Sequence, residues 1–190
     1  MQEIGSLHAL NLNLCKQITD SSLGRIAQYL KGLEVLELGS CSNITSTGLL
    51  LIAWALQHFK SLNLHSCCHL SDVGIRHLAG MMRRRAEGCL GLEQLTLQDC
   101  QKLTDLSLKR ISQGLTGLRL LNLSFCGGIS DTGLLHPSHT GSQCSLNLRS
   151  CDNIRDTGIM HLAIGSLHLS GLDVSFCDKV LLNCGVGEDS

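Results

Sequence analysis

The amino-acid sequence predicts an α/β solenoid, in which short parallel strands line the concave face and helices line the convex face. A segment with the pattern L-x-x-L-x-L-x-x-C recurs along the chain, and its cysteine returns mostly every 25 or 26 residues, with one step of 33 residues. Each copy continues into a Ser/Thr-Asp pair or a variant, followed by an apolar stripe at helical spacing. A strand and a helix that recur at a fixed period stack into a curved array.

Seven cysteines mark the register of this repeat, namely Cys15, Cys41, Cys67, Cys100, Cys126, Cys151 and Cys177. Period and pattern are those of a leucine-rich repeat of the cysteine-containing type. We expect one array of about seven repeats over residues 1–180. The last segment, residues 181–190, lacks the repeat pattern, which predicts a divergent, disordered tail and suggests truncation or a change of reading frame.

Each repeat should contribute one strand and one helix. The two leucines of L-x-L, such as Leu121 and Leu123, lie two residues apart, so they face the same side of a strand, toward the core. The Ser/Thr-Asp pair precedes the helical stripe, and a short acceptor there can cap a helix N-terminus. The predicted N-caps are Asp20, Ser46, Asp72, Asp105, Asp131 and Asp156.

The composition restricts the class of protein. Apolar residues make up 43% and aromatic residues 3% of the chain, so Leu, Ile and Cys must form the core. A net charge of −1 argues against nucleic-acid binding and against docking on a membrane surface. Seven of the eleven cysteines share the repeat position, which favours buried thiols in a reduced cytoplasmic or nuclear protein, and a disulfide framework is the alternative. Cys68, Cys89, Cys144 and Cys184 share no register.

The concave face is the predicted partner-binding surface, because its strand residues alternate between core and solvent. The candidate residues are Glu37, Asn63, His65, Gln94, Thr96, Gln98, Asn122, Phe125, Asn147, Arg149, Asp173 and Phe176. Phe125 and Phe176 occupy equivalent positions in a chain with few aromatics, so they are candidate anchors. Alternatively, the two rings fill space between loops and the polar residues are simply solvated.

Other motifs have a structural interpretation beside the functional one. Trp54 is either a partner anchor on the convex side or packs partly on its surroundings, and residues 83–85 (Arg-Arg-Arg) form either an acidic-partner or localisation patch or a solvated helix end. His65, Cys67, Cys68 and His69 resemble a zinc site, but His65 should face outward and Cys67 inward. We expect no metal or other cofactor. The chain carries no G-x-S-x-G, phosphate-loop or H-E-x-x-H motif, so we expect no enzyme activity.

Stretches such as L-N-L-C-K-Q-I-T-D-S-S-L-G-R-I-A and L-R-L-L-N-L-S-F-C-G-G-I-S-D resemble the repeat region of the F-box/LRR proteins. That family supplies substrate receptors to SCF-type ubiquitin ligases. The resemblance implies a concave face that binds protein substrates destined for ubiquitin-dependent degradation. The sequence has no segment before the repeats that resembles an F-box, so we do not expect contact with the adaptor Skp1. The alternative is an unstable truncated copy of such a receptor without a specific partner.

The fifth repeat predicts a weak joint with the sixth. Pro137 replaces an inward Ile or Leu of the helix, Thr140 replaces an apolar helix end, and Gln143 replaces the first leucine of the next strand segment. Each lost apolar contact costs about 2–5 kcal/mol, against a typical stability of about 5–15 kcal/mol for a whole domain.

We therefore expect limited proteolysis to cut first between Gly133 and Leu146, because local opening should be easiest there. Mass spectrometry of the earliest fragments would locate the cut. A first cut elsewhere, with this segment intact, would contradict a weak joint.

Overall fold

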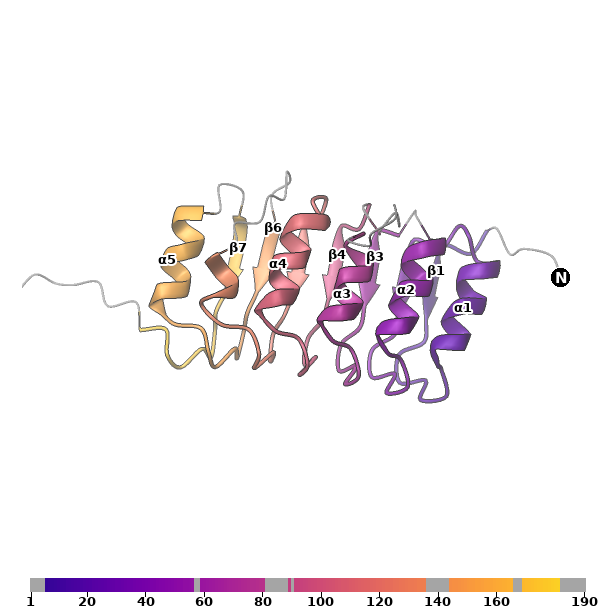
Figure 1. Ribbon diagram of the computed structural model, residues 1–190, viewed down its shortest axis with the longest axis horizontal. Helices are drawn as coiled ribbons and strands as arrows, with labels where there is room; N and C mark the ends of the chain where they lie inside the picture. Colours follow the sequence, from indigo (N-terminus) through magenta and orange to yellow (C-terminus); the bar gives the residue numbers. More distant parts are fainter. Residues whose placement is uncertain are drawn as a thin grey trace, which may run out of the picture.

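The computed structural model describes residues 6–56, 59–80, 89, 91–135, 144–165 and 169–181, and Figure 1 shows them as one elongated stack with a layer of helices beside a layer of strands. The strands are β1 (Ala9–Asn11), β2 (Val35–Glu37), β3 (Ser61–Asn63), β4 (Gln94–Thr96), β5 (Leu120–Asn122), β6 (Cys144–Asn147) and β7 (Leu169–Asp173). The helices are α1 (Asp20–Tyr29), α2 (Ser46–Ala55), α3 (Asp72–Leu78), α4 (Asp105–Gly114) and α5 (Asp156–Gly165), with a short 3₁₀ helix η1 (Gly133–Leu135) between α4 and α5.

The seven described strands form one parallel sheet whose spatial order equals their order in the chain. The pairing aligns equivalent residues, so that Leu36 lies beside Leu62, Leu62 beside Leu95 and Leu95 beside Leu121. These leucines are buried under the helices, and the residues between the leucines of L-x-L face the opposite side. The fold is therefore the predicted α/β leucine-rich-repeat solenoid.

The repeat cysteines tie each repeat to the one before it. The Cys41 thiol donates a hydrogen bond to the carbonyl oxygen of Leu12 at 3.2 Å. The same bond runs from Cys67 to Leu38 (3.3 Å), from Cys100 to Leu64 (3.2 Å), from Cys126 to Leu97 (3.2 Å), from Cys151 to Leu123 (3.2 Å) and from Cys177 to Leu148 (3.1 Å). Cys15 was expected to point inward but is exposed, because no described strand precedes β1 to receive its thiol.

The predicted N-caps are wrong by one residue. The N-cap residues of α1, α2, α3 and α4 are Thr19, Thr45, Ser71 and Thr104, and the predicted residues Asp20, Ser46, Asp72 and Asp105 are the first helical residues. Asp156 likewise begins α5, and Asp131 lies in the turn before η1. The Thr45 and Thr104 hydroxyls accept hydrogen bonds from the N–H groups of Thr47 and Leu106, each at 3.2 Å. A residue with extended backbone can cap a helix in this way, whereas the residue after it is already helical.

The aspartates instead bridge to the following repeat. Asp20 accepts hydrogen bonds from the backbone N–H and the hydroxyl of Thr45 at 2.8 and 2.6 Å. Asp105 accepts from the same groups of Ser130 at 2.7 and 2.6 Å. Asp72 accepts from both groups of Thr104, whereas Asp131 and Asp156 accept from the backbone N–H groups of Arg155 and Leu181. The next repeat must come close for this contact, since a Cβ added to Gly133 would lie 2.5 Å from Asp105 Oδ1.

Two cysteines outside the predicted register nevertheless belong to the core. Cys89 is buried, and its carbonyl accepts from the Leu92 N–H at 3.0 Å, as the Leu115 carbonyl accepts from the Leu118 N–H at 3.2 Å. Cys89 therefore takes the apolar position that ends the helical segment of the repeat. Cys144 is also buried and pairs with Leu169, and the register between β6 and β7 shifts by one residue after this pair. Cys144 thus adds an apolar thiol to the sheet next to the predicted joint.

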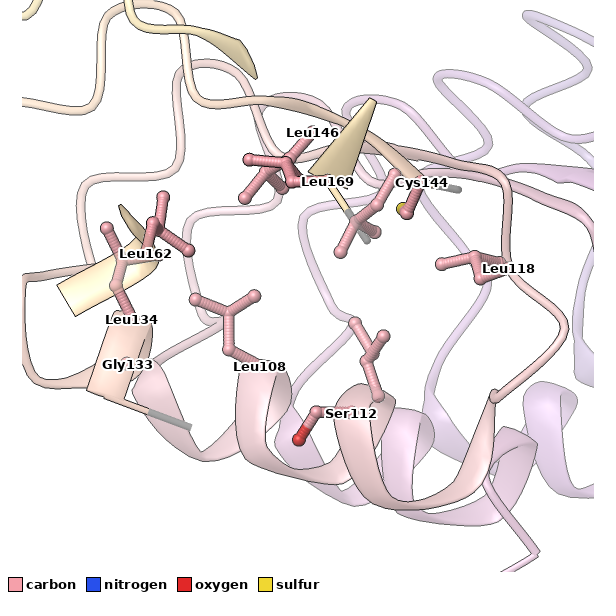
Figure 2. A pocket seen from close by; sticks show the side chains of 11 residues that line it. Leu108, Ser112, Leu118, Gly133, Leu134, Cys144, Leu146, Leu162 and Leu169 are labelled. Atoms are coloured by element: carbon pink, nitrogen blue, oxygen red, sulfur yellow. The ribbon is translucent and has the colours of Figure 1, made fainter. Parts of the chain in front are cut away.

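In its described part, the fifth repeat contains a short 3₁₀ helix before the joint with the sixth repeat. The described part of repeat five holds the three-residue η1 where α4 and α5 each have ten residues. A cavity of about 40 Å³ lies between α4, η1 and β6, and Figure 2 shows side chains such as Leu108, Leu134 and Leu146 around it. An apolar void of this size costs about 1 kcal/mol. Pro137, Thr140 and Gln143 themselves lie outside the described residues, as do residues 83–85 and 182–190.

None of the helices in the described ranges has both the length and the apolar character that crossing a bilayer requires.

The aspartate bridge can be tested with Asp105→Ala. The substitution leaves the N–H and hydroxyl of Ser130 without their acceptor, so we expect a loss of about 1–3 kcal/mol in the free energy of unfolding. Urea denaturation followed by circular dichroism measures this loss. Asp178→Ala removes an exposed aspartate and should change stability by no more than about 0.5 kcal/mol. Equal effects of the two substitutions would show that the bridge contributes nothing.

Candidate protein-binding surface

The outward residues of the sheet form rows across the repeats, because the strands pair without a register shift from β1 to β5. One row contains the residues between the two leucines of each strand, and six of the predicted contact residues belong to it: Glu37, Asn63, Thr96, Asn122, Asn147 and Asp173. Glu37 and Asn63 contact each other directly, since Asn63 Nδ2 donates to Glu37 Oε2 at 2.6 Å. The structure therefore brings these predicted residues together on one face.

Several side chains of this row also shape the backbone that follows them. Asn63 Oδ1 accepts from the N–H of His65 at 3.0 Å, and Asn122 Oδ1 accepts from the N–H of Ser124 at 2.9 Å. Asn147 and Asp173 make the equivalent bond to the N–H two residues on, each at 2.9 Å. Hydrogen bonds from the Ser175 side chain and, to a smaller extent, from its backbone N–H lower the pKa of the Asp173 carboxyl. These four residues have a structural role that could explain their presence without a partner.

The residue before each repeat cysteine has left-handed backbone. Leu14, Ser40, Ser66, Asp99, Phe125, Ser150 and Phe176 all have φ between 53° and 65°. This conformation directs the backbone N–H of Phe125 to the Arg149 carbonyl at 2.8 Å, which extends the ladder beyond the short strands. The Phe125 and Phe176 side chains are 44% and 65% exposed at these turns. Both rings are thus on the surface, as the hypothesis of aromatic anchors requires.

Two predicted contact residues form a stacked pair at the carboxyl ends of β6 and β7. The Arg149 guanidinium carbon lies 4.3 Å from the centre of the Phe176 ring. A guanidinium above an aromatic face is attracted by the negative face of the ring. Phe176 therefore already has a cationic neighbour from its own chain.

A groove of about 570 Å³ lies along the same edge of the sheet, beside Phe125. Its lining residues are Ser66, Gln98, Asp99, Gln101, Phe125, Gly127, Ser150 and Asp152. Gln101 Nε2 donates to Asp99 Oδ1 at 2.7 Å and to the Phe125 carbonyl at 2.8 Å, and Asp99 Oδ2 accepts from the Ser66 hydroxyl at 2.9 Å. Hydrogen bonds therefore hold the Asp99 carboxylate in place at the groove.

Sequence reasoning found Gln98 and Phe125 but missed the other groove residues, because it considered only strand residues and the two phenylalanines beside the cysteines. The missing residues lie in the turn around the repeat cysteine, either directly before it or directly after it. A signal was present in the sequence. These turn positions vary in polarity and charge between repeats, although their spacing from the cysteine is constant.

The opposite edge of the sheet carries alternating charges. Lys60 Nζ lies 2.7 Å from Glu34 Oε2, and Arg119 Nε lies 3.7 Å from Glu93 Oε2. The Glu34 carboxylate raises the pKa of the Lys60 ammonium group through this hydrogen bond. Exposed pairs of this kind contribute little to stability, but they leave this edge electrically balanced.

The histidine and cysteine cluster does not converge. The Cys67 thiol is buried and points to Leu38, whereas the His65 ring lies on the concave face within 3.3 Å of the Ser40 hydroxyl. His69 Nδ1 lies 3.3 Å from Lys102 Nζ, and Cys68 is exposed. No group of three or more potential metal ligands gathers anywhere in the described ranges. Trp54 is 75% exposed on α2.

Comparison with known proteins gives the same type of fold. A family profile described as Leucine Rich repeat matches residues 55–79, 115–135 and 145–163. The solved structure of the yeast Rad7 and Elc1 complex contains a similar chain, with a TM-score of 0.71 and 16% sequence identity. The match covers 90% of this chain and 43% of that chain, so this chain spans less than half the length of its structural neighbour.

Cysteine labelling can test the burial of the repeat thiols. Burial raises the pKa of Cys67 from 9.0 to about 12, so its thiolate fraction near pH 8 is about a thousandfold below that of an ordinary thiol. We expect iodoacetamide to label Cys68 and Cys15 rapidly and Cys67 slowly, as mapped by mass spectrometry. The buried, protonated Cys67 thiol contributes fully to the free energy of unfolding below about pH 9. This contribution is lost as the pH rises toward 12. Rapid labelling of Cys67 in the folded protein would contradict this burial.

Proposed function

We propose that this chain is a protein-binding module that holds its partner on the concave face of the sheet. The main support is the uninterrupted surface of seven parallel strands, in which side chains of equivalent residues are aligned from repeat to repeat. Leucine-rich repeats typically serve protein interaction, and such arrays offer an extended concave surface for this purpose. The residues proposed to contact the partner are those predicted from the sequence, including Gln94, Gln98, Phe125, Arg149 and Phe176.

The chemistry of the surface favours binding over catalysis. The buried repeat thiols are held in the protonated form, since burial raises the pKa of Cys126 to about 11 and that of Cys151 to about 12. Serine and histidine side chains near the strand ends hydrogen-bond to other polar side chains, as Ser124 does to Asn122 at 2.7 Å and Ser40 to His65 at 3.3 Å. A nucleophilic site would need an activated residue beside a base.

The finer proposal is that the partners are protein substrates of an SCF-type ubiquitin ligase in the cytoplasm or nucleus. Its support is the sequence resemblance to F-box/LRR proteins, and in particular to F-box/LRR-repeat protein fourteen. The structural neighbour is itself part of a complex, that of Rad7 with Elc1. On this proposal the repeats supply substrate recognition, and an F-box supplied by another segment or protein would make the contact with Skp1.

The second candidate is an unstable copy of such a receptor that has no specific partner. It is favoured by the described side of the joint between repeats five and six, where an apolar cavity lies beside the three-residue 3₁₀ helix η1. The two candidates differ in solution behaviour. A module should be monomeric and unfold cooperatively, whereas an unstable copy should aggregate at low temperature.

The module can be tested by introducing two bulky charges on the concave face. Gln94→Arg with Ser145→Arg places them at exposed strand positions, and Gln28→Arg with Gln113→Arg adds the same charge on exposed helix positions. Quantitative affinity capture from cell extract should show a loss of at least about tenfold in bound partners for the concave pair. The helix pair should bind like the unmodified protein, and the melting temperatures should agree.

Equal capture by both pairs of variants would contradict binding through the concave face. The ligase proposal needs a separate arm, in which an F-box is fused to the chain in cells. Ubiquitin on the captured partners should increase with the fusion and not with a fusion whose concave pair is substituted. An unchanged ubiquitin signal would contradict the role of the chain in a ligase but would not contradict protein binding by the concave face.

A further inference from the structure

Phe125 and Phe176 occupy equivalent positions, yet their surroundings differ. Both rings follow a strand, both have left-handed backbone and both are exposed at the same edge of the sheet. Arg149 covers the Phe176 ring at 4.3 Å, while in the described part of the chain no cation covers Phe125. The chain therefore contains one occupied and one open version of the same aromatic position.

The difference has a simple cause in the sequence. Arg149 lies two residues before Cys151, in the repeat that precedes Phe176. The residue at this position in the repeat before Phe125 is Gln98, two residues before Cys100. A glutamine amide carries no positive charge, so the Phe125 ring lacks the partner that Phe176 has, and Gln98 lines the groove instead.

We infer that the groove beside Phe125 binds an arginine side chain of the partner protein, with its guanidinium stacked on the Phe125 ring as Arg149 is stacked on Phe176. This inference rests on the proposed function, because it names the chemistry of the partner at that same surface. The planar guanidinium offers five donors and stacks on aromatic faces, which suits a groove lined by a ring, two carboxylates and amide oxygens.

The charges around the groove support a cationic occupant. Asp99 and Asp152 are its two charged lining residues, and both are acidic. Asp99 is oriented by Gln101 and Ser66, so its carboxylate needs little reorganisation to receive a cation. Nearby cations lie outside the groove: Lys102 Nζ is 3.3 Å from His69 Nδ1, and the Arg149 guanidinium lies on Phe176. The opposite edge of the sheet, with its paired charges, offers no such excess of one sign.

Fluorine NMR can test this inference directly, because the chain has three phenylalanines. Protein labelled with 4-fluorophenylalanine is titrated at low salt with the blocked tripeptide acetyl-Gly-Arg-Gly-amide. We expect the Phe125 signal, assigned with Phe125→Leu, to shift in a saturable manner. The buried Phe59 signal should stay constant and report an intact fold. The same tripeptide with citrulline, which has the shape of arginine without its charge, is the matched control.

Two substitutions separate the groove from general charge attraction. Asp99→Asn with Asp152→Asn keeps the size of the side chains and should weaken binding of the arginine peptide about fivefold. Glu34→Gln with Glu93→Gln removes the same charge at the opposite edge of the sheet and should leave binding within about twofold. An equal shift with the citrulline peptide, no shift of Phe125, or equal loss in both double variants would overturn the inference.

The arginine site and the proposed function can fail independently of each other. If Phe125 responds to the arginine peptide but the concave arginine variants capture the same proteins as the unmodified chain, the arginine site stands and the proposed function fails. If those variants lose their partners while Phe125 ignores the peptide, the binding module stands and the arginine site fails.

Discussion

Each repeat of this protein buries its leucines only with the help of the adjacent repeat. Hydrogen bonds between adjacent repeats hold them in this contact. A strand of three residues with one helix cannot bury its own leucines. The parallel ladder, the thiol bonds such as Cys100 to Leu64, and the carboxylate bridges such as Asp105 to Ser130 all join one repeat to the next. Because all three contacts recur at the same positions, they impose a single register on the stack.

This constraint explains both the order of the array and its weak point. Contacts in a solenoid extend only to neighbouring repeats, so a defect remains local. The described part of repeat five has the three-residue η1, and a cavity of about 40 Å³ opens beside Leu108 and Leu134. Nevertheless β5 and β6 pair in the common register, and Asp131 still accepts a hydrogen bond from the Arg155 N–H across the joint. Buried Cys144, which pairs with Leu169 beside a register shift, adds an apolar side chain to the sheet at this point.

Much of the fold was predictable from the sequence because the repeat gives each pattern several independent copies. The inward leucines, the parallel strands and the buried thiols all follow from the spacing. The aspartates were misplaced because capping is a local pattern, while Asp20 and Asp105 act across about 25 residues of chain. The close approach of Gly133 to Asp105 is a consequence of stacking, which no single repeat reveals. Cys89 and Cys144 were missed because an insertion and a bulge separate them from the register.

The binding surface was less predictable, since exposure on a strand does not distinguish a contact residue from one that holds a turn. Asn63 and Asn122 face outward as expected, yet their carboxamide oxygens are bound to the N–H groups of their own strand ends. These bonds leave less of each side chain for a partner. Equivalent positions that hold different residues in different repeats are better indicators of where a partner binds. Arg149 and Gln98 occupy the same position, and the exchange of one for the other decides whether the neighbouring phenylalanine ring is covered by its own chain or open to another.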